Sequence, residues 1–162
     1  PGQFKIDKDL IAKVTNSKIF YGDIKNTVGD FIKLNPNKIC CILFDLDYYS
    51  STKAFLDQVN TLKKYLLPRV LCYFDDLHVP EKYISNVNGM PLAINEFNSL
   101  NTNCKLGASV DHILDFKFPL AKSLIYVLHN FDNPDYNRFI GHSYGDDLSI
   151  KSKKINYSIL DD

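Results

Sequence analysis

The sequence predicts an α/β fold built on a doubly wound, mostly parallel β-sheet. Short, continuous apolar runs recur along the chain, as in strands that are buried on both faces. Segments whose apolar residues have helical spacing separate these runs. Alternating strands and helices are typical of parallel sheets that are covered by helices. The 162 residues and the 45% hydrophobic content suit one globular domain.

The predicted strands are apolar runs that end at polar residues. They comprise residues 19–21, 39–44, 70–74 and 124–128. One more strand is expected within residues 104–118, where it would pair antiparallel with residues 123–128 at an edge of the sheet.

Helical spacing and capping residues predict the helices. Asp7 can cap the first helix, and Thr27 can cap the second. A third helix is expected to begin at residues 50–52 and to end at Pro68, because proline cannot continue a helix. The last predicted helix covers residues 92–100.

Composition excludes several classes of function. The 19 Lys and Arg residues balance 19 Asp and Glu residues, so no large basic surface is expected to bind nucleic acid. No apolar run approaches the roughly 20 residues that a membrane-spanning helix needs. The four cysteines form no Cys-x-x-Cys pair, which favours free thiols in a reducing cytoplasm.

Acidic residues follow three of the predicted strands. They are Asp23, Asp45 and the pair Asp75 and Asp76. The carboxyl ends of parallel strands meet at one edge of a sheet, where ligands bind in open α/β folds. Converging carboxylates repel one another unless a cation binds, so the pattern favours a hard divalent cation. The alternative interpretation is that each aspartate caps the following helix or turn.

Four segments, in this order, carry a family resemblance. They are Tyr-Gly-Asp-Ile-Lys-Asn-Thr at 21–27, Phe-Asp-Leu-Asp-Tyr-Tyr-Ser-Ser-Thr-Lys at 44–53, Phe-Asp-Asp at 74–76 and Gly-x-x-x-Ala-x-x-Glu-Phe at 89–97. Together they resemble the class I S-adenosylmethionine-dependent methyltransferases, and most closely the macrocin O-methyltransferase-like group. The resemblance covers about residues 1–100.

The resemblance implies a Rossmann-like methyltransferase fold that binds S-adenosylmethionine. Gly22, Asp23 and Ile24 match the family's cofactor-binding segment, in which the aspartate faces the adenine amino group. The methyl acceptor would be a hydroxylated small molecule or a sugar.

The resemblance also implies a magnesium site. Asp45 matches a residue that is both a metal ligand and the candidate catalytic base, and Asp75 and Asp76 match the acidic pair that completes the site. A bound magnesium ion can lower the pKa of a substrate hydroxyl, and a nearby carboxylate can then accept its proton.

The chain departs from the family pattern at its N-terminus. The family's first two strands and its glycine-rich cofactor turn are absent, although its sheet order, 3-2-1-4-5-7-6, places those strands beside the one at 39–44. We therefore expect a fold that is incomplete at the N-terminus and leaves strand 39–44 at an exposed edge. Residues 1–130 would form the C-terminal part of a methyltransferase domain within a longer protein, and residues 131–162 a tail.

Other functions stay open. The segment 42–47 resembles the nucleophile motif of haloacid-dehalogenase-like magnesium-dependent phosphohydrolases, with Asp45 as nucleophile and Asp47 as acid and base. Tyr49 departs from that motif, which has Thr or Val at this position. A third possibility is a methyltransferase-fold remnant without catalysis. A glycosyltransferase with an Asp-x-Asp motif would leave the segment 89–97 unexplained.

Aromatic residues recur after the last predicted strand, which His129 follows. Phe131, Tyr136, Phe139 and Tyr144 could line an acceptor pocket, or they could hold the tail against the body of the domain.

Overall fold

The computed structural model describes residues 7–77, 85–109 and 124–138. The chain divides into two compact units, an N-terminal unit (Pro1–Pro36) and a C-terminal unit (Asn37–Asp162). Within the described ranges, no helix is long and apolar enough to cross a membrane.

The N-terminal unit contains two helices, α1 (Lys8–Val14) and α2 (Ile24–Lys33). Asp7 is at the start of α1, as predicted, and its carboxylate accepts a hydrogen bond from the Asp9 backbone. The strand predicted at residues 19–21 is wrong, because a strand needs a hydrogen-bonded neighbour and these residues pair with no strand among the described residues. Instead, the Phe20 ring packs edge-on against Phe31 of α2, with 6.2 Å between ring centroids.

The start of α2 also differs from the prediction. The helix begins at Ile24, and its N-cap is Asp23, whose carboxylate accepts a 2.9 Å hydrogen bond from the Lys25 backbone. Thr27 is a buried residue inside the helix and not its cap. Both residues are of types that cap helices, and Asp23 is the one that lies where the extended chain enters the helix.

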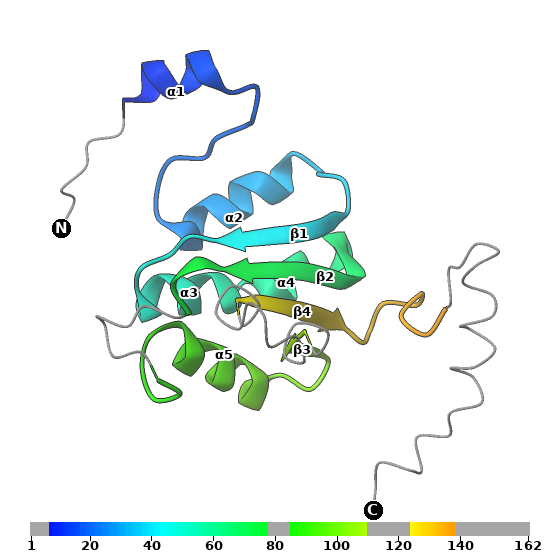
Figure 1. The fold of residues 1–162 in the computed structure, drawn as a ribbon. Helices are drawn as coiled ribbons and strands as arrows, with labels where there is room; N and C mark the ends of the chain where they lie inside the picture. The colour runs from blue at the N-terminus through cyan, green and yellow to red at the C-terminus, as the bar shows by residue number, and fades with distance from the viewer. Residues whose placement is uncertain (1–6, 78–84, 110–123, 139–162) are drawn as a thin grey trace, which may run out of the picture. The chain divides into compact units, whose positions relative to one another are not determined.

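The C-terminal unit is built on a four-stranded sheet of order β1-β2-β4-β3 (Figure 1). The strands are β1 (Ile39–Phe44), β2 (Leu66–Phe74), β3 (Cys104–Ala108) and β4 (Ile125–Asn130). The first two are parallel, and β4 is antiparallel to both β2 and β3. The α/β class is thereby confirmed as a mixed sheet with helices. The predicted antiparallel pairing of the last two strands is confirmed as well, with β3 at the edge.

The connection from β1 to β2 is not the single helix that the sequence predicted. It consists of α3 (Tyr49–Leu56), α4 (Val59–Leu62) and the short 3₁₀ helix η1 (Lys63–Tyr65). Pro68 lies inside β2 and ends no helix. It falls between the pairs Ile39–Leu66 and Cys41–Leu71, where the register of β1 and β2 shifts and the ladder can accommodate the missing N–H.

A second crossover follows β2 and includes η2 (Asp75–Leu77) and α5 (Gly89–Leu100), which contains the predicted helix 92–100. The Asn98 side chain of α5 donates to the Leu106 carbonyl and accepts from the Leu106 N–H, both at 2.8 Å. This amide thus pairs with the edge backbone of β3 as a neighbouring strand would.

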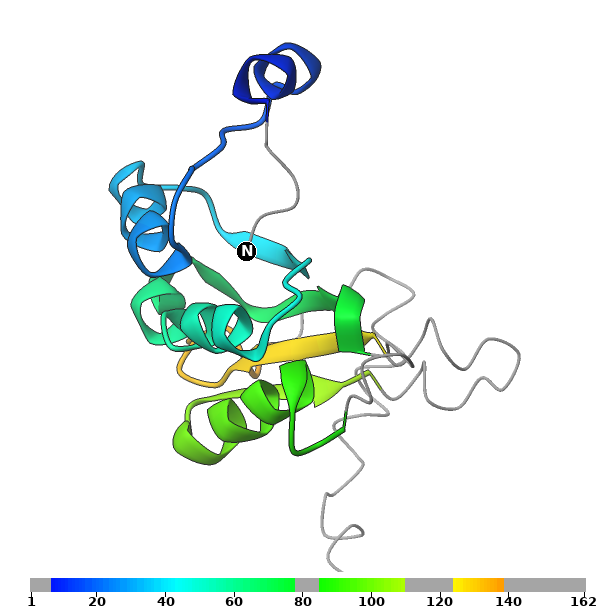
Figure 2. The same cartoon turned by 90° about the vertical axis from the view of Figure 1, so that its left-hand side faces the viewer.

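The hydrophobic core lies between the sheet and the helices of this unit, and Figure 2 shows α3 and α5 on the same side of the sheet. Phe44 of β1 stacks on Phe74 of β2 with 4.1 Å between ring centroids. Phe55 of α3 packs edge-on against Phe44, and Tyr126 of β4 packs edge-on against Phe74. The strand residues Val70, Cys72, Cys104, Leu106 and Leu128 complete this buried face.

The opposite face of the sheet has a different character. It carries Leu43, Leu71 and Tyr73, which alternate with the buried residues along β1 and β2. Leu43 is 72% exposed and Leu71 is 47% exposed. The described helices of this unit pack on the other face, so the doubly wound arrangement stays a prediction.

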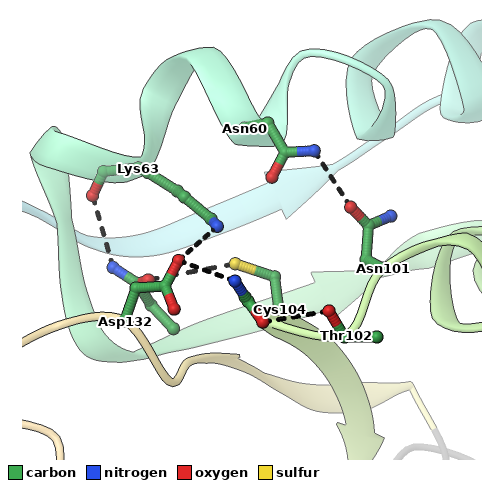
Figure 3. A network of polar contacts seen from close by, with 8 residues as sticks. Asn60, Lys63, Asn101, Thr102, Cys104 and Asp132 are labelled. Carbon is green, nitrogen blue, oxygen red and sulfur yellow. Dashed lines mark hydrogen bonds and ion pairs between the residues drawn. The ribbon is translucent and has the colours of Figure 1, made fainter.

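A polar network ties η1 to the amino end of β3 and to the segment after β4 (Figure 3). The Lys63 ammonium forms a 2.7 Å ion pair with Asp132, and the buried Asn130 amide donates to the Lys63 carbonyl. The bonds from Lys63 and Asn103 hold the pKa of the Asp132 carboxyl below its usual value. These contacts fix the sheet end opposite to the predicted metal site.

Candidate functional site

The predicted metal ligands follow two neighbouring strands. Phe44 and Phe74 are aligned in the parallel pair of β1 and β2, and Asp45 and Asp75 come directly after them. Both aspartates are exposed, and Asp76 is half-buried in η2. The structure therefore brings the chain positions of these three acidic residues to the same edge of the sheet.

Tyr73 is a partner of Asp75 that the sequence did not indicate. Its hydroxyl donates a 2.9 Å hydrogen bond to Asp75, and this bond raises the pKa of the Tyr73 phenol. Residues two apart on a strand share a face, so the alternation along β2 could have placed Tyr73 beside Asp75 in advance.

The geometry of a metal centre is not assembled among the side chains that the structure describes. Within residues 7–77, 85–109 and 124–138, no group of three or more His, Cys, Asp or Glu residues lies close enough to hold a metal ion. Asp45 is exposed and makes no hydrogen bond or ion pair in these ranges. Carboxylate oxygens are the donors that magnesium prefers, so the ligand set Asp45, Asp75 and Asp76 stays a prediction.

The predicted cofactor residues belong to the N-terminal unit. Gly22 has a φ of +145°, which residues with a side chain rarely adopt, and an added Cβ would come within 3.4 Å of Thr27. Asp23 caps α2, and Ile24 is the first residue of that helix. The tight turn and the cap give these three residues a local structural role, which is the alternative that the sequence left open for Asp23.

Tyr49 and Glu96 connect two of the segments that carry the resemblance. The Tyr49 hydroxyl donates a 2.7 Å hydrogen bond to the Glu96 carboxylate, which joins α3 to α5. This bond is the main cause of the raised pKa of the Tyr49 phenol. The hydrogen bond gives both residues a structural role. Because they lie far apart in the sequence, no local pattern could have predicted this contact.

A third cluster surrounds His129 near the end of β4. Its Nδ1 lies 2.7 Å from the Tyr136 hydroxyl, and its ring stacks on Phe131. Phe131 and Tyr136 also contact each other, with 4.9 Å between ring centroids. These contacts favour the interpretation in which both residues hold the segment after β4 against the sheet. Phe139 and Tyr144 lie outside the described residues.

Comparisons with known proteins add no assignment, since no family model, no curated protein and no solved structure matches this chain.

Proposed function

We propose that this chain is part of a class I S-adenosylmethionine-dependent O-methyltransferase that uses a divalent metal and acts on a hydroxylated small molecule or a sugar. The observation that carries the proposal is the strand order. The order β1-β2-β4-β3, with β4 reversed, corresponds to the 4-5-7-6 half of the sheet that the resemblance implies. Acidic residues follow β1 and β2, the two strands after which the family places its metal ligands.

In this proposal, Asp45, Asp75 and Asp76 hold a magnesium ion at the carboxyl edge of β1 and β2. A bound magnesium ion supplies a positive charge that lowers the pKa of an acceptor hydroxyl. Asp45 is exposed, so its carboxylate can reach that hydroxyl and accept its proton. Tyr73 orients Asp75 through their hydrogen bond and acts as a positioning residue.

The proposal gives Asp23 two roles, and two variants can separate them. Asparagine caps a helix about as well as aspartate, whereas alanine does not, so Asp23→Ala should destabilise the N-terminal unit by about 1 kcal/mol and Asp23→Asn should not. If Asp23 also contacts the cofactor, both variants, made in a version of the chain extended upstream to include the cofactor turn, should weaken the binding of S-adenosylmethionine in a calorimetric titration. If Asp23→Asn binds it as tightly as the wild type, the cofactor role is wrong.

Activity separates the proposal from its main alternative. Because the cofactor turn of the family is absent from these 162 residues, a version of the chain extended upstream to include it is used. It is incubated with magnesium and either radiolabelled S-adenosylmethionine plus a panel of sugars and phenols, or an aryl phosphate. We expect methyl transfer that Asp45→Asn abolishes. A matched control is Asp57→Asn, because Asp57 is an exposed aspartate whose ion pair with Lys53 contributes little. Phosphate release without methyl transfer would contradict the proposal and favour the phosphohydrolase.

A further inference from the structure

Three basic residues form a row across the sheet. The basic groups of two of them, Arg69 and His129, both contact Tyr136, whereas the Lys105 ammonium donates to the Asn98 carbonyl of α5. Arg69 of β2 is aligned with His129 of β4, and His129 is aligned with Lys105 of β3. Directly aligned residues of antiparallel strands project from the same face, with Cβ atoms about 4.5–5.5 Å apart. Arg69 precedes Asp75 by six residues along β2, or roughly 20 Å of strand, so this row is separate from the predicted metal site.

The half-buried His129 ring contacts Tyr136 through one nitrogen and has its other nitrogen beside Gly107. The Tyr136 hydroxyl lies 2.7 Å from Nδ1, and Arg69 donates a 3.0 Å hydrogen bond to the Tyr136 carbonyl. The Arg69 guanidinium also lies over the Tyr136 ring, 4.2 Å from its centroid. Opposite this contact, Nε2 faces Gly107, where an added Cβ would lie 3.7 Å away. The absence of a side chain at Gly107 leaves room beside Nε2.

In the described part of the chain, neither Arg69 nor Lys105 forms an ion pair with a carboxylate; the Lys105 ammonium donates to the Asn98 carbonyl. The acidic residues of the adjoining segment, Asp132 and Asp135, are paired with Lys63 and Arg138.

The imidazole itself adds a hydrogen-bond donor to these two cations. Burial and the neighbouring Arg69 lower the pKa of His129, so its imidazole is neutral at pH 7. In the tautomer in which the Tyr136 hydroxyl donates to Nδ1, the ring proton lies on Nε2, the nitrogen that lies beside Gly107.

We propose that this row is a binding site for the phosphate group of a small ligand. The His129 Nε2–H and the remaining N–H groups of Arg69 donate to the phosphate oxygens, and the Arg69 guanidinium supplies the positive charge. Phe131, which is 43% exposed and stacked on His129, provides an apolar wall for the group that carries the phosphate. The site takes no part in the methyl transfer proposed above.

The proposal is tested by following the His129 ring signals by NMR during pH titrations of the whole chain, with inorganic phosphate and with sodium chloride at equal ionic strength. A bound anion favours the protonated ring, so phosphate should raise the pKa of His129 by about one unit relative to chloride. Phenyl phosphate should act at lower concentration than inorganic phosphate, because its ring can contact Phe131. Equal pKa values in phosphate and chloride would overturn the proposal.

Two variants and one control locate the effect. The apparent affinity for phosphate, read from the phosphate-dependent shift, should fall about tenfold in Arg69→Gln. Arg138→Gln should leave this affinity unchanged, because it replaces an arginine that forms an ion pair with Asp135. Because Arg69→Gln also removes contacts to Tyr136, Gly107→Ala serves as the second variant. It keeps every charge and places a methyl group beside Nε2 at an ordinary contact distance, so it should weaken phosphate binding too. An unchanged affinity in both variants would place the phosphate elsewhere and refute the site.

Discussion

The two faces of the sheet differ in what they contribute. One face is closed by α3, α4 and α5, and its strand residues, such as Phe44 and Phe74, are almost completely buried. The other face leaves Leu43 and Leu71 exposed. It also carries Tyr73 with its bond to Asp75, and the row of basic residues around His129. The covered face thus accounts for stability, whereas polar groups that can bind ligands collect on the other face.

The sharpest test of this difference uses neighbours in β2 that point to opposite faces. Phe74→Ala should lower the free energy of unfolding by about 3–5 kcal/mol, because it leaves a cavity next to the Phe44 ring. Tyr73→Ala should cost only about 1 kcal/mol, the range of a cross-strand contact. Urea unfolding of both variants measures this. Equal losses would show that the second face is packed as tightly as the first.

The reactivity of the cysteines reports how strongly they are buried. Burial raises the pKa of Cys72 to about 12, from an ordinary value of 9.0, while Cys41 on the neighbouring strand is exposed. At neutral pH the thiolate fraction of Cys72 is therefore about a thousandfold lower than that of an ordinary thiol. Timed labelling with a disulfide reagent, followed by mass spectrometry, should modify Cys40 and Cys41 long before Cys72 and Cys104. Fast labelling of Cys72 in the folded protein would contradict the covered face.

The pH dependence of stability tests a residue on the open face of the sheet, His129. The pKa of His129 is lowered in the folded state from its ordinary value of 6.5. Below pH 6.5, the unfolded chain therefore binds more protons than the folded chain. The stability contributed by the neutral ring is therefore present above pH 6.5 and is lost as the pH falls below it. His129→Gln should reduce this loss in urea unfolding between pH 7 and pH 5. The same pH dependence in wild type and variant would show that other groups cause it.

The smallest effect is expected at the exposed end of β2. Tyr73→Phe removes the bond to Asp75 and keeps the ring, so the free energy of unfolding should change by about 0.5 kcal/mol or less. A loss of several kcal/mol would show that this pair is part of the packed structure and not a group at an open edge.

The pattern of apolar residues predicts the elements whose formation depends on nearby residues. The six apolar residues of β1 and the spacing in α5 were enough to find both. The strand expected at residues 19–21 fails because strands depend on distant partners, which a short apolar run cannot reveal. The prediction that Pro68 ends a helix is wrong for a similar reason. Only the register shift between β1 and β2 shows that a strand can hold a proline, which lacks an N–H, at this position.

The candidate site divides in the same way. The positions of Asp45 and Asp75 at one edge follow from the rule for parallel strands, and the structure has this arrangement. The bonds from Tyr49 to Glu96 and from His129 to Tyr136 depend on how helices and turns pack, so they became visible only in three dimensions.

We propose that the carboxylates after β1 and β2 bind one divalent cation. The most direct measurement is a titration of the protein with Mn²⁺ followed by electron paramagnetic resonance, with Mg²⁺ as competitor. We expect one bound ion, an affinity at least about tenfold weaker in Asp45→Asn and in Asp75→Asn, and no change in Asp57→Asn. Absence of binding, or equal binding by all three variants, would contradict the proposed metal site.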